Sequence, residues 1–282
     1  GAGFLGSLLP LEEKHGQDIW KKTKYIAGSS IGGFIGTGLV IGYSVREMLA
    51  MFLDTNFPSL CSFFQDDHKK IRSIKNLFTD LGMDPGTKLF DYVTCILEKK
   101  IKPDITFKQL YDQTQQTLLM TSACLTDGKT GYFSWYHTPD VEVRKAVLMT
   151  IRLPLLYTPI LHEEKLHIDG NFFDPFPIKA LPKEARKIAR EGGLLGIVLG
   201  KQDKSYKIET SFQVMTTLLT HISSKYVELS CKRYRNSILR LSMDIVNGTN
   251  LNVTKNDLEI IADWGKEMGT AYFEKRGYPT LR

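Results

Sequence analysis

The chain has 282 residues, 42% of them hydrophobic and 24% charged, with a formal charge of +6 at pH 7 and a pI near 9.0. This composition is typical of a soluble globular protein and excludes an extended disordered chain, since no segment is biased enough to remain unfolded. The length allows one large or two modest domains, and we predict a single domain over residues 1–282.

The first predicted elements surround a Gly-x-Ser-x-Gly pattern. A short strand over 24–28 ends at Gly28, Ser30 lies at a sharp turn, and a helix over 31–43 follows. Strand, turn and helix in this order predict a nucleophile elbow, in which the first amides of the helix point toward the Ser30 hydroxyl. We expect a side chain at Gly28 or Gly32 to crowd the neighbouring strand and helix.

The same region has a second interpretation. Residues 26–45 contain no charged side chain and are about as long as a membrane span requires. Their glycines also follow the small-residue spacing of packed transmembrane helices. However, the glycine and serine cluster at 28–33 would weaken a helix and dilutes the hydropathy, so the sequence favours a helix buried inside a globular fold.

Strands and helices alternate through the rest of the chain. The spacing of apolar residues predicts helices over 45–52, 71–81, 88–100, 107–111, 141–151, 208–231 and 258–275. It also predicts a β-hairpin of 117–125 and 132–135 that turns at Asp127-Gly128, strands over 165–168 and 238–243, and a strand over 194–199 that is buried on both faces. Loops are predicted over 234–236 and 247–252. This alternation predicts a layered α/β fold around a central sheet.

An elbow serine needs a base and donors for the oxyanion, because a serine hydroxyl is a weak nucleophile at neutral pH. Asp169 directly follows the strand over 165–168, so a strand end can present it to Ser30. Ser29 is the neighbouring nucleophile, but only Ser30 is two residues from both glycines. Asp174 is a competing base that is more typical of a turn residue.

Two other constellations remain open. Ser30, Asp169 and His221 satisfy the serine, acid, histidine order of α/β hydrolases, although His221 falls in a predicted helix where a triad histidine normally lies in a loop. A second group resembles a loose metal cluster and consists of His162, Glu163, Glu164 and His167. Its spacing matches no strong zinc pattern, so a solvated loop explains it better.

Together these segments resemble the patatin-like phospholipases, which are serine hydrolases with a Ser-Asp dyad. Residues 28–32 match the elbow of that family, Asp169-Gly170 matches its Asp-Gly motif, and 121–134 and 146–159 match the hairpin and the approach to the aspartate. The resemblance implies a layered α/β/α fold with a central, mainly parallel sheet, a catalytic core over about 1–182, and a C-terminal strand and helices over 183–282.

The resemblance also implies an activity. Ser30 would attack a fatty acyl ester while Asp169 takes its proton and later activates water, as in a phospholipase A or lysophospholipase, with no cofactor and no metal. The motif glycines would be Gly28, Gly32 and Gly170. Asn171 stands where the family usually has a second glycine, and asparagine tolerates unusual backbone angles.

The chain departs from the family pattern at its first residues. Residues 1–6 resemble the Gly-Cys-Gly-Phe-Leu-Gly form of triglyceride lipase relatives, which would make Gly1, Ala2 and Gly3 the oxyanion donors. Alternatively, residues 5–13 align with the helix after the oxyanion loop, and most donors lie upstream of residue 1. A catalytically impaired module that binds lipid or protein is therefore a second functional hypothesis.

Charge and cysteine content bear on partners and location. Basic residues gather in three clusters, over 21–24, 183–190 and 232–240, which would attract an anionic membrane, although an ordinary solvated surface explains them as well. Four dispersed cysteines are typical of a reducing compartment. We expect a cytoplasmic, peripherally membrane-associated protein that acts on phospholipid or another acyl lipid, with no nucleic-acid partner; a protein activator remains open.

Overall fold

The computed structural model describes residues 1–61, 67–200, 211–241 and 253–278. The chain divides into two compact units, one of Gly1–Lys22, Ser44–Asp54 and Ile178–Arg282 and one of Thr23–Tyr43 and Thr55–Pro177. The second unit contains the predicted elbow and the predicted aspartate.

The second unit consists of short strands alternating with helices. Its strands are β1 (Tyr25–Gly28), β2 (Gly82–Asp84), β3 (Thr117–Cys124), β4 (Lys129–Phe133), β5 (Leu155–Tyr157), β6 (Ile160–His162) and β7 (Lys165–Asp169), and its helices are α3 (Ile31–Val40), α5 (Asp67–Thr79), α6 (Thr87–Glu98), α7 (Phe107–Thr114) and α8 (Val143–Thr150). The mixed α/β architecture around a central sheet that the sequence predicts is confirmed.

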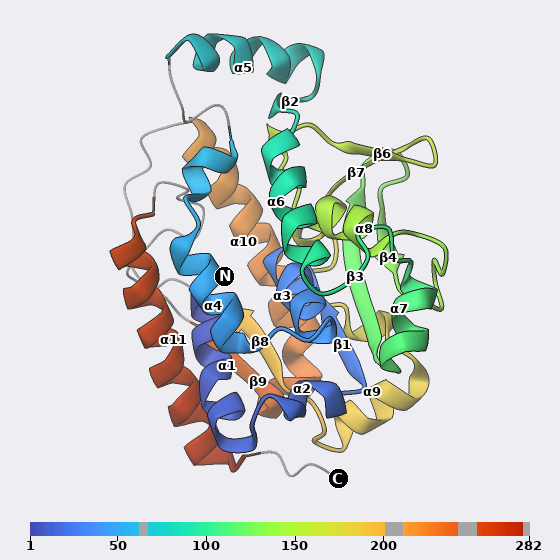
Figure 1. Ribbon diagram of the computed structural model, residues 1–282, viewed down its shortest axis with the longest axis vertical. Coiled ribbons are helices and arrows are strands. Elements are labelled where there is room, and N and C mark those ends of the chain that lie inside the picture. The colour runs from blue at the N-terminus through green and yellow to red at the C-terminus, as the bar shows by residue number, and fades with distance from the viewer. Residues whose placement is uncertain (62–66, 201–210, 242–252, 279–282) are drawn as a thin grey trace. The chain divides into compact units, whose positions relative to one another are not determined.

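β3 is the central strand of the five-stranded sheet (Figure 1). It is buried at every position, pairs with β1 in parallel, and pairs with β4 and β7 antiparallel, while β6 pairs antiparallel with β7. The expectation of a mainly parallel sheet is therefore wrong for the central sheet, which is mixed. The physical reason is that short turns join β3 to β4 and β6 to β7, and strands joined by such turns must run antiparallel.

The register of β3 places the ends of β1 and β7 next to each other. Met120 pairs with Gly28 on one edge of β3 and with Phe133 of β4 on the other, while Ser122 pairs with Asp169 on the edge opposite β4. Because a strand has only two hydrogen-bonding edges, β1 and β7 lie end to end along the same edge. Their C-terminal ends meet opposite the single residue Thr121.

Helices α3 and α8 cover this sheet. α3 contacts β1 and β3, α8 contacts β3 and β7, and the two helices contact each other. Positions 33–40 of α3 are all buried, as predicted for an uncharged helix inside a globular fold. Among the helices of the described ranges, none is long and apolar enough to cross a membrane.

Three strands of this unit were not predicted: β2, β5 and β6. β2 pairs in parallel with β5, and β6 forms a hairpin with β7. Each has three residues, too few for an alternating pattern to be recognised. The segment 82–86 was expected only to separate two helices.

The first unit is mainly helical. Its helices are α1 (Ala2–His15), α2 (Asp18–Lys22), α4 (Val45–Asp54), α9 (Lys183–Arg190), α10 (Ser211–Cys231) and α11 (Lys255–Arg276), and its strands are β8 (Gly196–Leu199) and β9 (Ile238–Leu241), which pair in parallel. α1 and α11 lie side by side (Figure 1). A Cβ at Gly265 or Gly269 would collide with the carbonyls of Gly3 or Ser7, so this packing needs glycines.

Two details of this unit differ from expectation. β8 was expected to be buried on both faces, but Leu199, its last residue, is 53% exposed in the described part of the chain. The loop predicted over 234–236 is part of a 3₁₀ helix, Lys232–Ser237. The loop predicted over 247–252 and the first residues of the helix predicted from 208 lie outside the described residues.

Candidate functional site

Ser30 occupies a strained turn between β1 and α3. Its backbone has φ 53° and ψ −131°, a region that residues other than glycine rarely adopt. A short strand that ends at residue 28 and a helix that begins at residue 31 leave only two residues for the reversal. The predicted elbow conformation is thus present, and the Ser30 side chain at this turn is half-buried.

The two glycines of the elbow motif have different roles. A Cβ at Gly28 would overlap the carbonyl group of Gly32 and lie 2.6 Å from the Gly33 nitrogen, so the close approach of β1 and α3 needs glycine there. The expectation that Gly32 is sterically required is wrong, since a Cβ at that position has no atom within 4 Å. Position 32 faces open space because it lies on the first, half-buried turn of α3.

The structure brings the predicted nucleophile and the predicted base together. The Ser30 hydroxyl donates a hydrogen bond to Oδ2 of Asp169 at 2.5 Å, although 139 residues separate them in the chain. Asp169 is the last residue of β7 and is 1% exposed. The two side chains meet where the ends of β1 and β7 converge on β3.

Backbone groups hold the aspartate in place. Oδ1 of Asp169 accepts from the backbone N–H of Asn171 at 2.9 Å, and the Asp169 N–H donates to the carbonyl of Arg152 at 2.8 Å. Burial raises the pKa of Asp169 to about 7, and the hydrogen bonds from Ser30 and Asn171 oppose this shift. A carboxylate with this pKa can accept and return a proton near neutral pH.

The residues after Asp169 explain the Asp-Gly motif. A Cβ at Gly170 would overlap the backbone carbonyl and the hydroxyl of Thr121, so glycine lets the chain pass against β3. Asn171 lies in a 3₁₀ helix, Gly170–Phe172, and is not among the described residues with positive φ. Asparagine therefore meets no backbone strain where the family pattern has glycine.

The competing candidates lie in other surroundings. Among the described residues, the buried Oγ of Ser29 has no hydrogen-bond partner. Asp174 accepts from Tyr132 and from the Phe176 N–H, which gives it the role of a turn residue. His221 is exposed on α10. The acid that contacts Ser30 directly is therefore Asp169.

The loose metal constellation does not form a site in the described part of the chain, where no group of three or more His, Cys, Asp and Glu could hold a metal ion. Glu163 and Glu164 form the turn between β6 and β7, with φ values of 49° and 61°. His167 is buried and its Nδ1 lies 2.7 Å from Oγ of Ser122, the β3 residue that pairs with Asp169.

Thr150 supports the site and was not predicted. The last residue of α8, it is fully buried, and its hydroxyl accepts the Ser30 N–H at 2.8 Å. The only signal in the sequence was a polar residue at the end of an apolar helix. This signal does not distinguish a residue that positions Ser30 from one that caps the helix. Tertiary packing alone identifies its partner.

The predicted oxyanion residues lie at the start of α1. Gly1 is the N-cap of that helix, and Ala2 and Gly3 are in its first turn. The N–H groups of a first turn have no acceptor within their own helix and are available to an anion. Their assignment as oxyanion donors stays a prediction.

Comparisons with known proteins concern the family and the fold of the chain. Residues 1–182 match the family model described as patatin-like phospholipase. An uncharacterized protein of Acanthamoeba polyphaga mimivirus is 26% identical over 236 residues, 79% of this chain and 73% of that protein. A probable lipid hydrolase of Invertebrate iridescent virus 6 is 28% identical over 184 residues, 63% of this chain and 58% of that protein.

Among solved structures, VipD from Legionella pneumophila has a similar fold. Its TM-score is 0.56 at 13% sequence identity, over 98% of this chain and 65% of the VipD chain. At this identity the likeness concerns the fold. The chain spans less than two thirds of both the iridescent-virus protein and VipD.

Proposed function

The chain belongs to the patatin-like phospholipase family, and from this premise we propose that it is a lipid acyl hydrolase that cleaves fatty acyl esters with Ser30 and Asp169. The observation that carries the proposal is the direct hydrogen bond from the Ser30 hydroxyl to the Asp169 carboxylate at 2.5 Å. The kinship to a probable lipid hydrolase of Invertebrate iridescent virus 6 supports an ester of a lipid as the substrate.

The reaction begins with proton transfer. Asp169 accepts the hydroxyl proton as Ser30 Oγ attacks the ester carbonyl, and a tetrahedral oxyanion forms. The intermediate collapses to an acyl-serine, and protonated Asp169 returns its proton to the leaving alcohol. Asp169 then deprotonates a water that attacks the acyl-serine, and it returns this proton to Ser30 Oγ as the fatty acid leaves. No step needs a cofactor.

Stabilisation of the oxyanion is the second part of the proposal. Following the family resemblance, we assign it to the backbone N–H groups of Gly1, Ala2 and Gly3, which lie at the first turn of α1. Loss of one such donor lowers kcat by roughly two to three orders of magnitude in serine hydrolases. A donor set upstream of residue 1 is the alternative.

Partners and location follow from the same proposal. The substrate is a phospholipid or another acyl lipid, reached by peripheral contact with an anionic membrane through the basic clusters. Binding to acidic vesicles should then weaken as salt increases. The four cysteines, which all lie in the described ranges, form no disulfide with one another, which supports a reducing compartment such as the cytoplasm.

The test compares adjacent serines in the full chain. We expect Ser30→Ala and Asp169→Ala to abolish fatty acid release from phospholipid vesicles, while Ser29→Ala keeps it within about twofold because the Ser29 hydroxyl has no partner among the described residues. A fluorophosphonate probe should label wild type and Ser29→Ala but not Ser30→Ala. Release or labelling retained in Ser30→Ala would contradict the proposal, and an unlabelled, folded wild type would favour a binding module.

A further inference from the structure

Ser122 and His167 form a buried, hydrogen-bonded pair beside Asp169. Oγ of Ser122, on β3, lies 2.7 Å from Nδ1 of His167, on β7, and both residues are buried. Ser122 pairs with Asp169 across the two strands, while His167 precedes Asp169 by two residues on β7. Cross-strand partners, and residues two apart on one strand, have their side chains on the same face of a sheet. Ser122 and His167 therefore share the face on which the Asp169 side chain lies.

The direction of this hydrogen bond follows from the burial of Ser122. Within the described residues, the Ser122 hydroxyl has one hydrogen-bond partner, Nδ1 of His167. A buried hydroxyl proton without an acceptor is unfavourable, so Ser122 is the donor and Nδ1 is the acceptor. The His167 ring is then neutral, with its own proton on Nε2.

The surroundings of His167 agree with a neutral ring. Burial is the main cause that lowers its pKa, and His162 and Lys165 lower the pKa further. Asp127, in the turn between β3 and β4, and Glu163, in the turn between β6 and β7, act in the opposite direction. The net shift is downward, so the imidazole remains an acceptor for Ser122 at neutral pH.

The Ser122 hydroxyl is turned away from Asp169. Gly131 of β4 pairs with Ser122 on the other edge of β3, and a Cβ at Gly131 would lie 2.7 Å from Oγ of Ser122 and 3.3 Å from Cε1 of His167. The hydroxyl and the ring thus occupy space that a side chain on β4 would fill. In the described part of the chain, the Asp169 carboxylate accepts from Ser30 and from the Asn171 N–H, and not from Ser122.

Asp169 is sensitive to any additional hydrogen-bond donor. Burial raises its pKa to about 7, and the hydrogen bonds from Ser30 and Asn171 oppose this shift. No charged side chain of the described residues adds to these two bonds. A third donor to the carboxylate would favour its ionised form and make it a weaker base.

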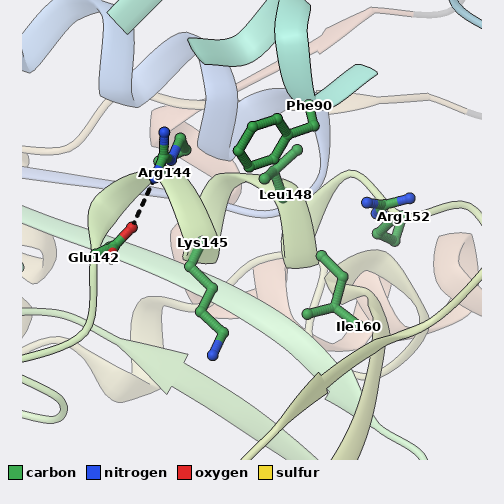
Figure 2. Close-up of a pocket in the computed structure, with 7 residues that line it drawn as sticks. All are labelled: Phe90, Glu142, Arg144, Lys145, Leu148, Arg152 and Ile160. Atoms are coloured by element: carbon green, nitrogen blue, oxygen red, sulfur yellow. Dashed lines mark hydrogen bonds and ion pairs between the residues drawn. The ribbon is translucent and has the colours of Figure 1, made fainter. Parts of the chain in front are cut away.

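The cations of α8 and of the segment after it lie around a separate pocket. Arg152 accepts the Asp169 N–H with its carbonyl, but its guanidinium donates to a carbonyl just before α6. Figure 2 shows Arg152, Arg144 and Lys145 among the residues that line a pocket of about 270 Å³, and Asp169 is not part of this lining. The ionisation of Asp169 therefore depends on its burial and on the hydroxyl and amide groups beside it.

We propose that His167 is a positioning residue for the Ser30–Asp169 pair: by accepting the Ser122 hydroxyl, it keeps that hydroxyl from donating to the Asp169 carboxylate. The inference rests on the proposed hydrolase function, in which Asp169 takes the proton of Ser30. Without the acceptor on His167, rotation about the Cα–Cβ bond of Ser122 brings its hydroxyl within reach of its cross-strand partner. The resulting charge-assisted hydrogen bond weakens Asp169 as a base.

The test measures the ionisation of Asp169 without turnover. The ¹³C resonance of its carboxyl group is titrated by NMR in the full chain, in wild type, in His167→Phe, and in His167→Phe combined with Ser122→Ala. We expect His167→Phe to move the midpoint to a proton concentration at least about tenfold higher, since the carboxylate gains one charge-assisted hydrogen bond. The double variant has no hydroxyl to donate and should return the midpoint to within about twofold of wild type.

The kinetic measurement uses the same variants and a soluble neutral ester. In His167→Phe the rise of kcat/KM should move to lower pH, and kcat on the plateau should fall about threefold because the base is weaker. His167→Asn places an acceptor close to the position of Nδ1 and should retain the wild-type profile.

The matched control is Phe133→Leu. Phe133 is buried on β4 with its ring centroid 6.0 Å from that of His167, and it has no hydrogen-bonding group. The substitution disturbs the same packing and should leave the midpoint of Asp169 within about twofold of wild type. His167→Leu carries the same expectation as His167→Phe and replaces it if unfolding midpoints show that phenylalanine prevents folding.

Four results would each overturn the proposal. Three are an unchanged midpoint without the imidazole, no recovery in the double variant, and a shift in Phe133→Leu as large as that in His167→Phe. The fourth needs no variant: ¹⁵N NMR of wild type at pH 7 should show the proton of the His167 ring on Nε2, and a proton on Nδ1 would contradict the assigned donor. Absent ester release by wild type would instead contradict the hydrolase function and leave the NMR midpoints unaffected.

Discussion

The backbone N–H of Ser30 donates to the hydroxyl of Thr150 at 2.8 Å, across 120 residues of chain. This bond joins the elbow between β1 and α3 to the C-terminal end of α8. The Arg152 carbonyl, two residues further on, accepts the N–H of Asp169. One short segment of chain therefore positions both the serine and the aspartate.

Thr150→Val should lower kcat about tenfold, because the substitution keeps the shape of the side chain but leaves the Ser30 N–H without its acceptor at a strained backbone position. KM for a soluble ester should change little. Thr150→Ser retains the hydroxyl and should keep most of the activity. Steady-state kinetics of all three proteins, with unfolding midpoints to confirm folding, would decide, and equal activity of Thr150→Val and wild type would contradict this role.

The pH dependence of the reaction should report Asp169. The pKa of this carboxyl is raised to about 7 by burial, and the base is active only when ionised. The value of kcat/KM for a neutral ester should therefore rise with pH through about 7 and then level off. Asp169→Asn should lose about two to four orders of magnitude in kcat and show no such rise. A profile that is flat from pH 5.5 to 8.5 in wild type would exclude Asp169 as the base.

The same carboxyl should destabilise the folded protein at high pH. Its pKa in the folded state lies above the usual value of 3.8, so between about pH 4 and pH 7 the folded protein keeps a proton that the unfolded chain releases. The contribution of Asp169 to the free energy of unfolding therefore falls as pH rises from about 4 to about 7, by up to about 4 kcal/mol. Asp169→Asn should thus be more stable than wild type at pH 8 and should lose this advantage near pH 4. Denaturant titrations at both pH values measure the difference, and an advantage that does not grow with pH would contradict it.

The two elbow glycines provide a matched pair. Gly28→Ala should destabilise the protein by about 1 to 3 kcal/mol and abolish activity, because the new Cβ overlaps the Gly32 carbonyl. Gly32→Ala should fold as well as wild type or up to about 1 kcal/mol better, because its Cβ meets no atom and alanine favours a helix. Chemical denaturation tests both, and similar losses from both substitutions would show that the motif is required as a whole.

His221 distinguishes the dyad from a triad. The side chain is exposed on α10, and the Asp169 carboxylate already contacts Ser30. His221→Ala should therefore keep kcat within about twofold, whereas a triad histidine would cost roughly the same as the serine. A loss in His221→Ala as large as that in Ser30→Ala, measured with the same ester, would support the triad.

Local sequence patterns predicted the elements that carry the proposed chemistry. The strand before Gly28, the helix after Ser30 and the strand before Asp169 all have short-range signals, and each lies within a few residues of its predicted bounds. The sequence predicted less well how individual residues pack against other elements. Gly28 and Gly32 look equivalent in the motif, yet of the two only Gly28 has another element where an added Cβ would lie. Leu199 belongs to an apolar run but is exposed in the described part of the chain.

The sequence by itself determined which residue types could perform acyl transfer and on which kinds of element they lie, since backbone reversals and side-chain periodicity are local properties. Only the tertiary structure decided that the ends of β1 and β7 meet at Thr121, that Thr150 supports Ser30, and that the Arg152 carbonyl accepts the Asp169 N–H. These relationships join residues more than 100 positions apart in the chain or depend on how separate elements pack. They follow from strand register and helix packing, which no local pattern encodes.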